Sequence, residues 1–592
     1  MEVIVNAEEI KKRAEAYIRE EKDADFRSEV EELLKKGDMN ELTERFYQSL
    51  EFGTGGLRGI IGGGTNRMNT LMIHKATQGL ANYCIKAMSD KASKGELKAA
   101  IAYDSRRYSD VFAEAAACIF AANGFTVYLF TGLRPTPELS YIVRKYGCTT
   151  GVVVTASHNP PQYNGYKAYW SDGAQVTPPH DKGIIEEVNK VETIRMISKD
   201  EAVKQGKIIL VDSEVDEKYW TMCKNQLFRP ALIKEKAKEV RVVYTPLHGT
   251  GAMHVEKVLG DLGLTVITVP EQRSPDGNFP TVEKPNPEEA PALKMAIELA
   301  KKEKADAVMA TDPDADRFGS AVPDSEGNWV LINGNQMGVL LADYIILSRK
   351  ELNKMPQNPA LIRSIVTSPM VDYIAKANGV HVDECLTGFK WIASVMNGYD
   401  EKKNFNYIFG FEESYGYNVE TEVRDKDGVS AAAMCAEMTL YWRSQGKSLL
   451  ERLEELYKTY GYFEDRSISK TFLGASGGET MKKIMAKLRA EGLKTLGGKK
   501  VVKIRDIGES VAYNPENPNA REKLSFPSSN VLQFFLEDGT IVSARPSGTE
   551  PKIKFYINAV ILNAPSLDEA KKTAQALCAA IEKEIQAVLD AA

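Results

Sequence analysis

The chain has 592 residues, of which 43% are hydrophobic and 27% charged, and its formal net charge is −6 at pH 7. This length exceeds what one hydrophobic core supports, so several domains are expected. An acidic chain lacks the basic face of nucleic-acid-binding proteins, which excludes that class, and no run approaches the roughly 18 apolar residues of a membrane span. The seven scattered cysteines and an early charged N-terminus, without a signal-peptide core, predict a cytoplasmic protein.

The first segment, residues 6–50, is rich in Glu, Lys, Ala and Leu and carries apolar residues at helical spacing, which predicts two or three helices. Short β-branched strands then alternate with longer helical segments, as at 100–103 and 111–122, and the alternation resumes near residues 240 and 360. This rhythm predicts three successive blocks of βαβ units with parallel or mixed sheets.

The last segment differs from these βαβ blocks. From residue 467 onward it contains several predicted strands and two predicted helices, at 479–491 and 566–589, which indicates an α+β domain. Connectors rich in proline, glycine or charge divide the chain. The expected domains span residues 1–210, 211–325, 326–455 and 456–592.

The stretch GVVVTASHNP, residues 151–160, begins as a β-branched run and turns polar at Ser157. The run predicts a buried strand, and the polar continuation predicts a turn-forming segment. This segment brings the Ser157 hydroxyl, the His158 imidazole and the Lys167 amine within eleven residues. Because open α/β sheets bind ligands at the carboxyl ends of their strands, these groups are candidates for a site.

A second candidate is TDPDADR, in which Asp312, Asp314 and Asp316 follow an apolar strand at alternate positions. Three carboxylates in so small a volume suit a hard divalent cation such as Mg²⁺. Arg317 beside them indicates an anion nearby. The alternative interpretation of the segment is a solvated acidic turn.

Three further loops follow predicted strands. RPSGT, residues 545–549, offers a guanidinium, two hydroxyls and a glycine turn to a tetrahedral anion, or is a simple serine-threonine turn. TGFK, residues 387–390, and GFEESYG, residues 410–416, carry groups suited to vicinal sugar hydroxyls. The glycine-rich FGTGGLRG, residues 52–59, fits neither a dinucleotide fingerprint nor a Walker A loop.

TASHNP with its following lysine, DPDADR, TGFK, GFEES and RPSGT together resemble the α-D-phosphohexomutase superfamily, in its longer phosphoglucomutase/phosphomannomutase branch with the FGTGGLRG motif. The resemblance covers about residues 45–560. It implies an α/β fold of four domains around a central cleft. Three would be related mixed α/β sandwich domains, and the C-terminal one an α+β domain like that of the TATA-box-binding protein.

The resemblance also implies roles for particular residues. Ser157 would be the phosphorylated serine, and it would bind Mg²⁺ together with Asp312, Asp314 and Asp316. The implied catalytic residues are Ser157, His158, Lys167 and Lys390, with the two lysines the better proton-transfer candidates. The implied substrate-binding residues are Thr54, Arg58, Arg317, Thr387, Gly388, Glu412, Ser414, Arg545, Ser547, Gly548 and Thr549.

The implied activity is that of a phosphoglucomutase, which interconverts glucose 1-phosphate and glucose 6-phosphate through a phosphoserine enzyme and a glucose 1,6-bisphosphate intermediate. Glu413 resembles the glucose-preferring members. Phosphomannomutase, phosphopentomutase, a Mg²⁺-dependent phosphatase and a catalytically dead sugar-phosphate-binding paralogue are the alternatives. The expected partner is a small-molecule sugar phosphate, with neither nucleic acid nor membrane, and the chain is expected to be a monomer or a small homo-oligomer. Arg106 and Arg107 are interpreted as a solvated charge pair, and His248 as a structural loop histidine.

Overall fold

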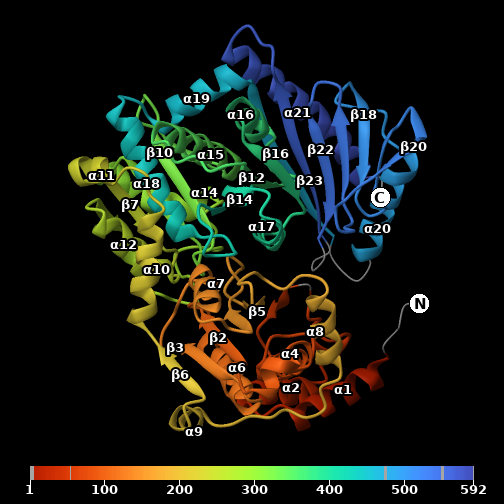
Figure 1. The fold of residues 1–592 in the computed structure, drawn as a ribbon. Helices are drawn as coiled ribbons and strands as arrows, with labels where there is room; N and C mark the ends of the chain where they lie inside the picture. Colours follow the sequence, from red (N-terminus) through yellow and green to blue (C-terminus); the bar gives the residue numbers. More distant parts are fainter. Residues whose placement is uncertain (1–5, 54, 473–476, 548–551, 591–592) are drawn as a thin grey trace. The chain divides into compact units, whose positions relative to one another are not determined.

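The computed structural model describes residues 6–53, 55–472, 477–547 and 552–590 (Figure 1). The chain forms two compact units. The first comprises Met1–Asn333 with Tyr415–Tyr441, and the second comprises Gly334–Ser414 with Trp442–Ala592. None of the helices in the described ranges has the length and apolar character needed to cross a membrane.

Three short helices open the first unit, in agreement with the sequence. They are α1 (Ala7–Glu20), α2 (Ala24–Lys36) and α3 (Met39–Phe46). Each begins after an Asn or Asp whose side chain accepts a backbone hydrogen bond, which satisfies a donor that a helix N-terminus leaves unpaired. The apolar stripes of these helices pack into one small core.

The first α/β sheet has six strands in the order β1-β5-β4-β2-β3-β6. The strands are β1 (Gly56–Ile60), β2 (Lys98–Tyr103), β3 (Thr126–Phe130), β4 (Thr150–Val154), β5 (Tyr163–Trp170) and β6 (Ile208–Val211). Figure 1 shows α7 (Thr136–Lys145) on one side of this sheet and α4 (Thr70–Ala87) and α6 (Ser109–Ala122) on the other. The remaining helices of this region are α5 (Ser89–Ser93), α8 (His180–Asn189) and α9 (Lys199–Lys204).

The strand β4 is buried along its whole length, as its β-branched sequence predicts. The prediction of a turn-forming segment after Ser157 is wrong beyond residue 162, because residues 163–170 form β5, which pairs antiparallel with β4. The aromatic residues of YNGYKAYW favour a strand and outweigh its polar positions. The pairing places Lys167 opposite Val153, next to the end of β4.

A second sheet in the same unit has the order β11-β10-β9-β7-β8. Its strands are β7 (Arg241–Thr245), β8 (Thr265–Thr268), β9 (Ala307–Thr311), β10 (Phe318–Pro323) and β11 (Trp329–Ile332). The helices of this region are α10 (Ser213–Asn225), α11 (Pro230–Lys236), α12 (Gly251–Asp261), α13 (Pro270–Arg273) and α14 (Ala290–Glu303). The strand β15 (Gly416–Asn418) and most of α18 (Gly428–Ser444) also belong to this unit.

The second unit begins with a parallel sheet in which β12 (Pro359–Ser364) lies between β13 (His381–Cys385) and β14 (Asn406–Glu412). Its helices are α15 (Gly334–Glu351), α16 (Met370–Asn378), α17 (Phe389–Lys402) and α19 (Leu449–Tyr460).

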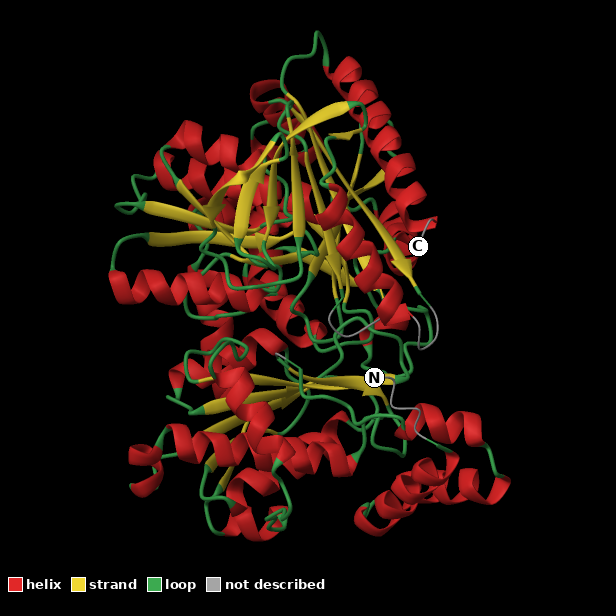
Figure 2. Ribbon diagram, turned by 90° about the vertical axis from the view of Figure 1, so that its right-hand side faces the viewer, coloured by secondary structure: helices red, strands yellow, loops and turns green. Residues whose placement is uncertain are grey.

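The C-terminal part of this unit contains an antiparallel sheet in the order β16-β23-β22-β21-β18-β19-β20. The strands are β16 (Tyr462–Thr471), β17 (Thr495–Leu496), β18 (Lys499–Asp506), β19 (Val511–Asn514), β20 (Asn517–Lys523), β21 (Leu532–Leu536), β22 (Ile541–Pro546) and β23 (Lys552–Ile561). The helices α20 (Gly477–Glu491) and α21 (Leu567–Asp590) share its core, and Figure 2 shows α21 running alongside the strands. The mixed α/β class and the α+β C-terminal domain predicted from the sequence are therefore confirmed.

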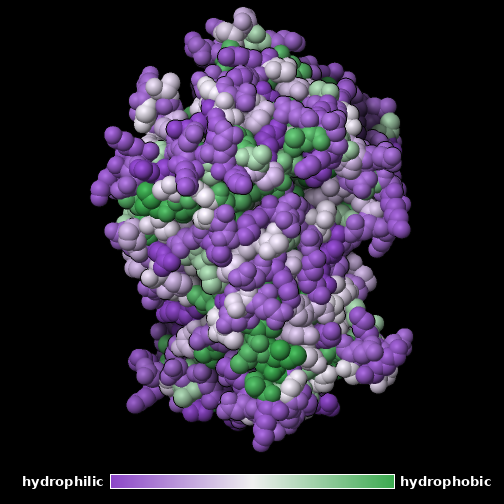
Figure 3. Space-filling view, turned by 60° about the vertical axis from the view of Figure 1, so that its left-hand side comes forward, coloured by the Kyte–Doolittle hydropathy of each residue, from purple (hydrophilic) through white to green (hydrophobic). Residues whose placement is uncertain are grey.

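The face of the molecule in Figure 3 is mostly hydrophilic, and its hydrophobic residues lie in separate patches. Such scattered apolar exposure is ordinary for folded domains, so this view alone indicates no docking surface.

Candidate active site

Ser157 lies three residues after the end of β4 in a backbone conformation that favours glycine, with φ of 52°. A left-handed conformation is uncommon for serine and persists only where the surroundings enforce it. The residue is 4% exposed, and its Oγ donates to Asp312 Oδ2 over 2.6 Å. His158 Nδ1 lies 3.2 Å from the same Oγ. The fold thus brings together a nucleophile candidate and an acidic residue 155 positions away in the sequence.

The acidic segment forms the loop between β9 and β10, and Asp312, Asp314 and Asp316 are all buried. One oxygen of each lies within 4.8 Å of the others. Oδ1 of Asp314 and Oδ1 of Asp316 are buried and have no hydrogen-bond partner within the described ranges. Buried carboxylate oxygens without partners are costly, and a divalent cation would satisfy them. The donor set therefore fits a hard metal ion, and a solvated acidic turn is excluded by the burial.

Two lysines balance the acidic cluster. Lys167 Nζ lies 2.7 Å from Asp314 Oδ2 and 3.2 Å from Asp316 Oδ2. Lys426 Nζ, which the sequence analysis missed, lies 3.1 Å from Asp316 Oδ2. Its only sequence signal is its place between two acids in RDKDG, just before an apolar helix. The Oδ2 atom of Asp316 thus faces cations, while its Oδ1 atom remains for another ligand.

The burial of this cluster perturbs its pKa values in opposite directions. Burial, followed by the charges of Asp314 and Asp316, raises the pKa of Asp312 well above its ordinary value. Burial also opposes ionisation of Asp316, but Lys167 and Lys426 outweigh it and hold the pKa of that carboxyl below its usual range. Neighbouring carboxyls whose pKa values shift in opposite directions indicate a site with excess negative charge, which a bound cation would neutralise.

Thr136, at the start of α7, is a second residue that the sequence analysis missed. Its Oγ1 donates to Asp314 Oδ2 over 2.7 Å, and its backbone N–H donates to the Asp314 carbonyl over 2.9 Å. The threonine is fully buried. It fixes the orientation of Asp314 from the side opposite Oδ1, and nothing in the local RPTP sequence indicates this contact.

Two arginines lie close to the serine loop, residues 157–163. The Arg317 backbone N–H donates to Asp312 Oδ1 over 3.0 Å, and its side chain reaches Glu288. Arg58, which is exposed on β1, contacts Asn159 Oδ1 at 3.4 Å. Burial, followed by the charges of Arg317 and Arg58, lowers the pKa of His158 well below its ordinary value, so this imidazole is neutral at pH 7.

Arg106 contradicts its interpretation as half of a solvated charge pair. It is 3% exposed and donates to backbone carbonyls of the serine loop, whereas Arg107 is exposed as expected. The side chains of these two adjacent residues lie in different environments, one buried and one exposed. The sequence shows two neighbouring arginines and does not reveal which of them is buried. His248 is a buried loop residue that hydrogen-bonds Thr281 Oγ1 at 2.8 Å, in keeping with a structural role.

In the second unit, the TGFK and GFEES loops meet at the ends of β13 and β14. The Gly388 N–H donates to Glu412 Oε1 over 2.5 Å, and Gly388 has φ of 108°, which requires glycine. Lys390 is the second residue of α17, which begins just after Gly388. Glu413 Oε2 accepts from the hydroxyls of Ser364 and Thr367 at 3.1 and 3.3 Å.

The RPSGT segment begins within the last two residues of β22 in the same unit. Arg545 is the last residue but one of that strand and lies beside Tyr556, and the Ser547 N–H donates to the Lys552 carbonyl over 2.7 Å. Three predicted substrate-binding residues, namely Thr54, Gly548 and Thr549, lie outside the described residues. Thr387 and Ser414 lie in the two loops named above, as their motifs require.

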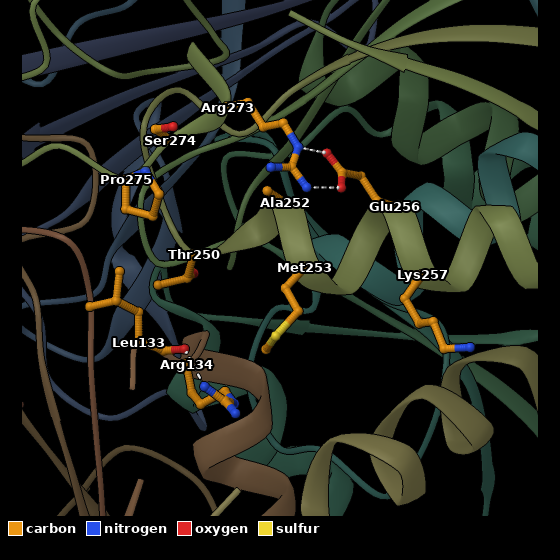
Figure 4. A pocket seen from close by; sticks show the side chains of 11 residues that line it. Leu133, Arg134, Thr250, Ala252, Met253, Glu256, Lys257, Arg273, Ser274 and Pro275 are labelled. Atoms are coloured by element: carbon orange, nitrogen blue, oxygen red, sulfur yellow. Dashed lines mark hydrogen bonds and ion pairs between the residues drawn. The ribbon is translucent and has the colours of Figure 1, made fainter. Parts of the chain in front are cut away.

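A separate open pocket of about 640 Å³ contains none of the predicted site residues. Figure 4 shows its wall at α12, where Arg273 pairs with Glu256 through two contacts of 2.8 Å each. On another side, Arg134 is bound by Asp216 and Asp212. Because its charged groups have partners within the protein, this pocket is a weaker candidate than the serine and aspartate loops.

Comparison with known proteins agrees with the motifs. Models of the phosphoglucomutase/phosphomannomutase alpha/beta/alpha domains I, II and III match residues 49–195, 217–327 and 333–460. A phosphoglucomutase of Staphylococcus aureus (strain USA300) is 37% identical over 543 residues, covering 91% of this chain and 94% of the relative. A phosphopentomutase of Homo sapiens is 35% identical over 591 residues, covering 96% and 94%.

Among solved structures, the exocytosis-sensitive phosphoprotein parafusin of Paramecium, described as a phosphoglucomutase, matches with a TM-score of 0.65 at 18% identity. The match covers 92% of this chain and 95% of parafusin, and at this identity it supports the fold alone. The curated relatives are named mutases and match almost end to end, and the three domain models follow one another in order along the sequence. This chain therefore belongs to the phosphoglucomutase/phosphomannomutase family of the α-D-phosphohexomutase superfamily and is an enzyme of the mutase class.

Proposed function

We propose that the protein is a phosphoglucomutase that interconverts glucose 1-phosphate and glucose 6-phosphate by way of a phosphorylated Ser157. The observation that carries this proposal is the contact of 2.6 Å between Ser157 Oγ and Asp312, within a buried cluster of three aspartates. A serine in this place can carry a phosphoryl group next to a metal ion, which is the arrangement that phosphoryl transfer requires.

In the proposed reaction the phosphoryl group leaves Ser157 Oγ and bonds to the free hydroxyl of the sugar monophosphate, whose proton passes to a basic group. Ser157 Oγ takes up a proton as its bond to phosphorus breaks. The resulting glucose 1,6-bisphosphate then returns its other phosphoryl group to Ser157 Oγ, whose proton passes to the released sugar oxygen. Asp312, Asp314, Asp316 and the phosphoserine would hold Mg²⁺, which neutralises phosphoryl charge when bound. Lys167 and Lys390 are the proposed proton-transfer residues. His158 is neutral and contacts Ser157 Oγ, so we assign it to bracing the loop.

The remaining predicted residues would bind the substrate. Glu412 would accept hydrogen bonds from sugar hydroxyls, since an ionised carboxylate accepts from vicinal hydroxyls. The non-reacting phosphate needs fixed donors, which the loop that begins at Arg545 offers. The proposed substrate-binding residues are Thr54, Arg58, Arg317, Thr387, Gly388, Glu412, Ser414, Arg545, Ser547, Gly548 and Thr549.

The same proposal gives each predicted domain a role. Residues 1–210 would carry the phosphoserine, 211–325 the metal, 326–455 the sugar hydroxyls and 456–592 the non-reacting phosphate.

Glucose is the proposed sugar because the second glutamate of the GFEES motif, Glu413, resembles the glucose-preferring members of the family. Its side chain is held by the hydroxyls of Ser364 and Thr367. A phosphopentomutase is the second candidate. It is favoured by the human relative of that name, which covers 96% of this chain.

The test is phosphorus NMR of the enzyme with Mg²⁺, a trace of glucose 1,6-bisphosphate and equal glucose 1-phosphate, mannose 1-phosphate and ribose 1-phosphate. We expect the glucose 1-phosphate signal to convert fastest to a 6-phosphate. Faster conversion of ribose 1-phosphate would establish the second candidate, and faster conversion of mannose 1-phosphate a phosphomannomutase. Release of inorganic phosphate at the rate of isomerisation would indicate a phosphatase, and no conversion at all would contradict the proposed mutase.

A further inference from the structure

The serine loop is held in place by residues that do not themselves react. We propose that Arg106 is a positioning residue for phosphoryl transfer, which fixes the loop from Ser157 to Tyr163 so that Ser157 Oγ faces the aspartate cluster. The inference rests on the proposed role of Ser157 as the phosphorylated residue.

The guanidinium of Arg106 is enclosed by this loop. Its Nη2 donates to the carbonyls of Ser157 and Asn159 over 2.5 Å each. Its Nη1 donates to the carbonyls of Pro160 and Tyr163 over 2.9 and 3.0 Å. An arginine has four hydrogens on these two nitrogens, so each terminal hydrogen has its own carbonyl. One side chain thereby fixes four points of a loop seven residues long.

Arg106 is itself held from the other side. Its Nε lies 3.4 Å from Asp104 Oδ2, and its guanidinium lies 4.9 Å from the centre of the Phe279 ring. Burial lowers the pKa of Arg106 to about 10, with Asp104 opposing the shift, so the side chain stays charged at neutral pH. A buried cation with fixed partners on both sides cannot change rotamer without losing them.

Asp104 connects this cation to the residue before the loop. Thr155 Oγ1 donates to Asp104 Oδ2 over 2.6 Å and accepts the Ser157 N–H over 2.8 Å. Ser157 is therefore held at both its N–H and its carbonyl by one connected network, which explains how its left-handed conformation is maintained. Without Arg106, four inward-facing carbonyls would lack their donors, and the loop would turn them toward water.

The adjacent Arg107 is exposed and provides a matched control, because the same substitution one residue away touches none of these contacts. We expect Arg106→Ala to lower kcat about 100-fold, since a displacement of about 1 Å at a reacting group costs that much. KM for glucose 1-phosphate should change less than about threefold, because the contacts of Arg106 within the described ranges are to backbone carbonyls of the serine loop, Asp104 and Phe279. Arg107→Ala should match the wild type in both constants.

Guanidinium at millimolar concentration should partly restore kcat of Arg106→Ala and leave Arg107→Ala unchanged, which a merely destabilised protein would not show. Arg106→Lys supplies a second comparison that keeps the buried charge but only one donor nitrogen, so we expect a loss of kcat there too. The matched control for Arg106→Lys is Arg107→Lys. A kcat of Arg106→Ala within twofold of that of Arg107→Ala, or a kcat of Arg106→Lys within twofold of that of Arg107→Lys, would overturn the proposal, as would a loss confined to KM. The wild-type enzyme tests the proposed mutase function separately from the role of Arg106. If the wild type transferred no phosphoryl group, the proposed function would be contradicted, whereas the tests of Arg106 compare variants with an active wild type.

Discussion

Replacing Thr136 with valine should weaken metal binding while leaving the fold intact. The substitution keeps the shape of the side chain and the backbone bond to the Asp314 carbonyl, and removes only the hydrogen bond of 2.7 Å to Asp314 Oδ2. A hydrogen bond to a charged acceptor contributes about 1.5–3 kcal/mol. Loss of such an outer partner typically lowers metal affinity about 10–100-fold, which corresponds to about 1.4–2.8 kcal/mol. Because Lys167 still holds the same oxygen at 2.7 Å, we expect the lower end, about tenfold.

Calorimetric titration of the purified protein with Mg²⁺ measures this change directly. The matched control is Thr77→Val, which also removes a buried threonine hydroxyl, bonded to the Ile73 carbonyl over 2.8 Å within α4. Thr77→Val should leave the affinity for Mg²⁺ unchanged. Equal affinity in the Thr136 variant and the wild type would refute the reasoning, because Asp314 would then need no support from α7.

Three further predictions follow from the site and from a buried acid. Ser157→Ala should abolish mutase turnover in the presence of glucose 1,6-bisphosphate, and normal turnover would show that another residue carries the phosphoryl group. Arg545→Ala should raise KM for the sugar phosphate about 10–100-fold, as for the loss of one charged hydrogen bond, and an unchanged KM would remove the loop from the substrate site. Burial, with help from Asp427, raises the pKa of Glu420 to about 8, so the folded protein keeps a proton that the unfolded chain releases above about pH 4.5. Stability should fall as pH rises through this window, and Glu420→Gln should gain in stability over the wild type from pH 5 to 8 in urea unfolding; a difference independent of pH would contradict this.

Local patterns in the sequence predict much of the fold, because the residue types along a strand reflect whether that strand is buried. The strand β4 reads TGVVV, with three consecutive valines, and all five residues are buried. The strand β5 was harder to predict, because YNGYKAYW has a polar residue and a lysine within it. Its second face is covered by other parts of the unit, so Lys167 lies inside the protein only because the aspartate loop supplies its partners.

Some residues of the site can be predicted from their neighbours in the sequence, and others cannot. The three aspartates fall within five residues, so their spacing indicates a candidate cation site, and their burial in the folded unit excludes the alternative of a solvated turn. Thr136 and Lys426 meet that cluster from far along the chain, and Thr136 lies 178 positions from Asp314. No periodicity encodes such a meeting, since it depends on which helices and strands become neighbours in the folded unit.

Arg106 shows what strand pairing would add to such a prediction. The strands β2 and β4 are parallel neighbours, and their register pairs Tyr103 with Val154. The next residues, Asp104 and Thr155, must then emerge side by side, and they share a hydrogen bond of 2.6 Å. Because the carboxyl ends of parallel strands meet at one edge of the sheet, DSR after β2 and TASHNP after β4 form a single structural unit. The pairing of these strands therefore determines which of two adjacent arginines holds the serine loop, and the residue types alone do not.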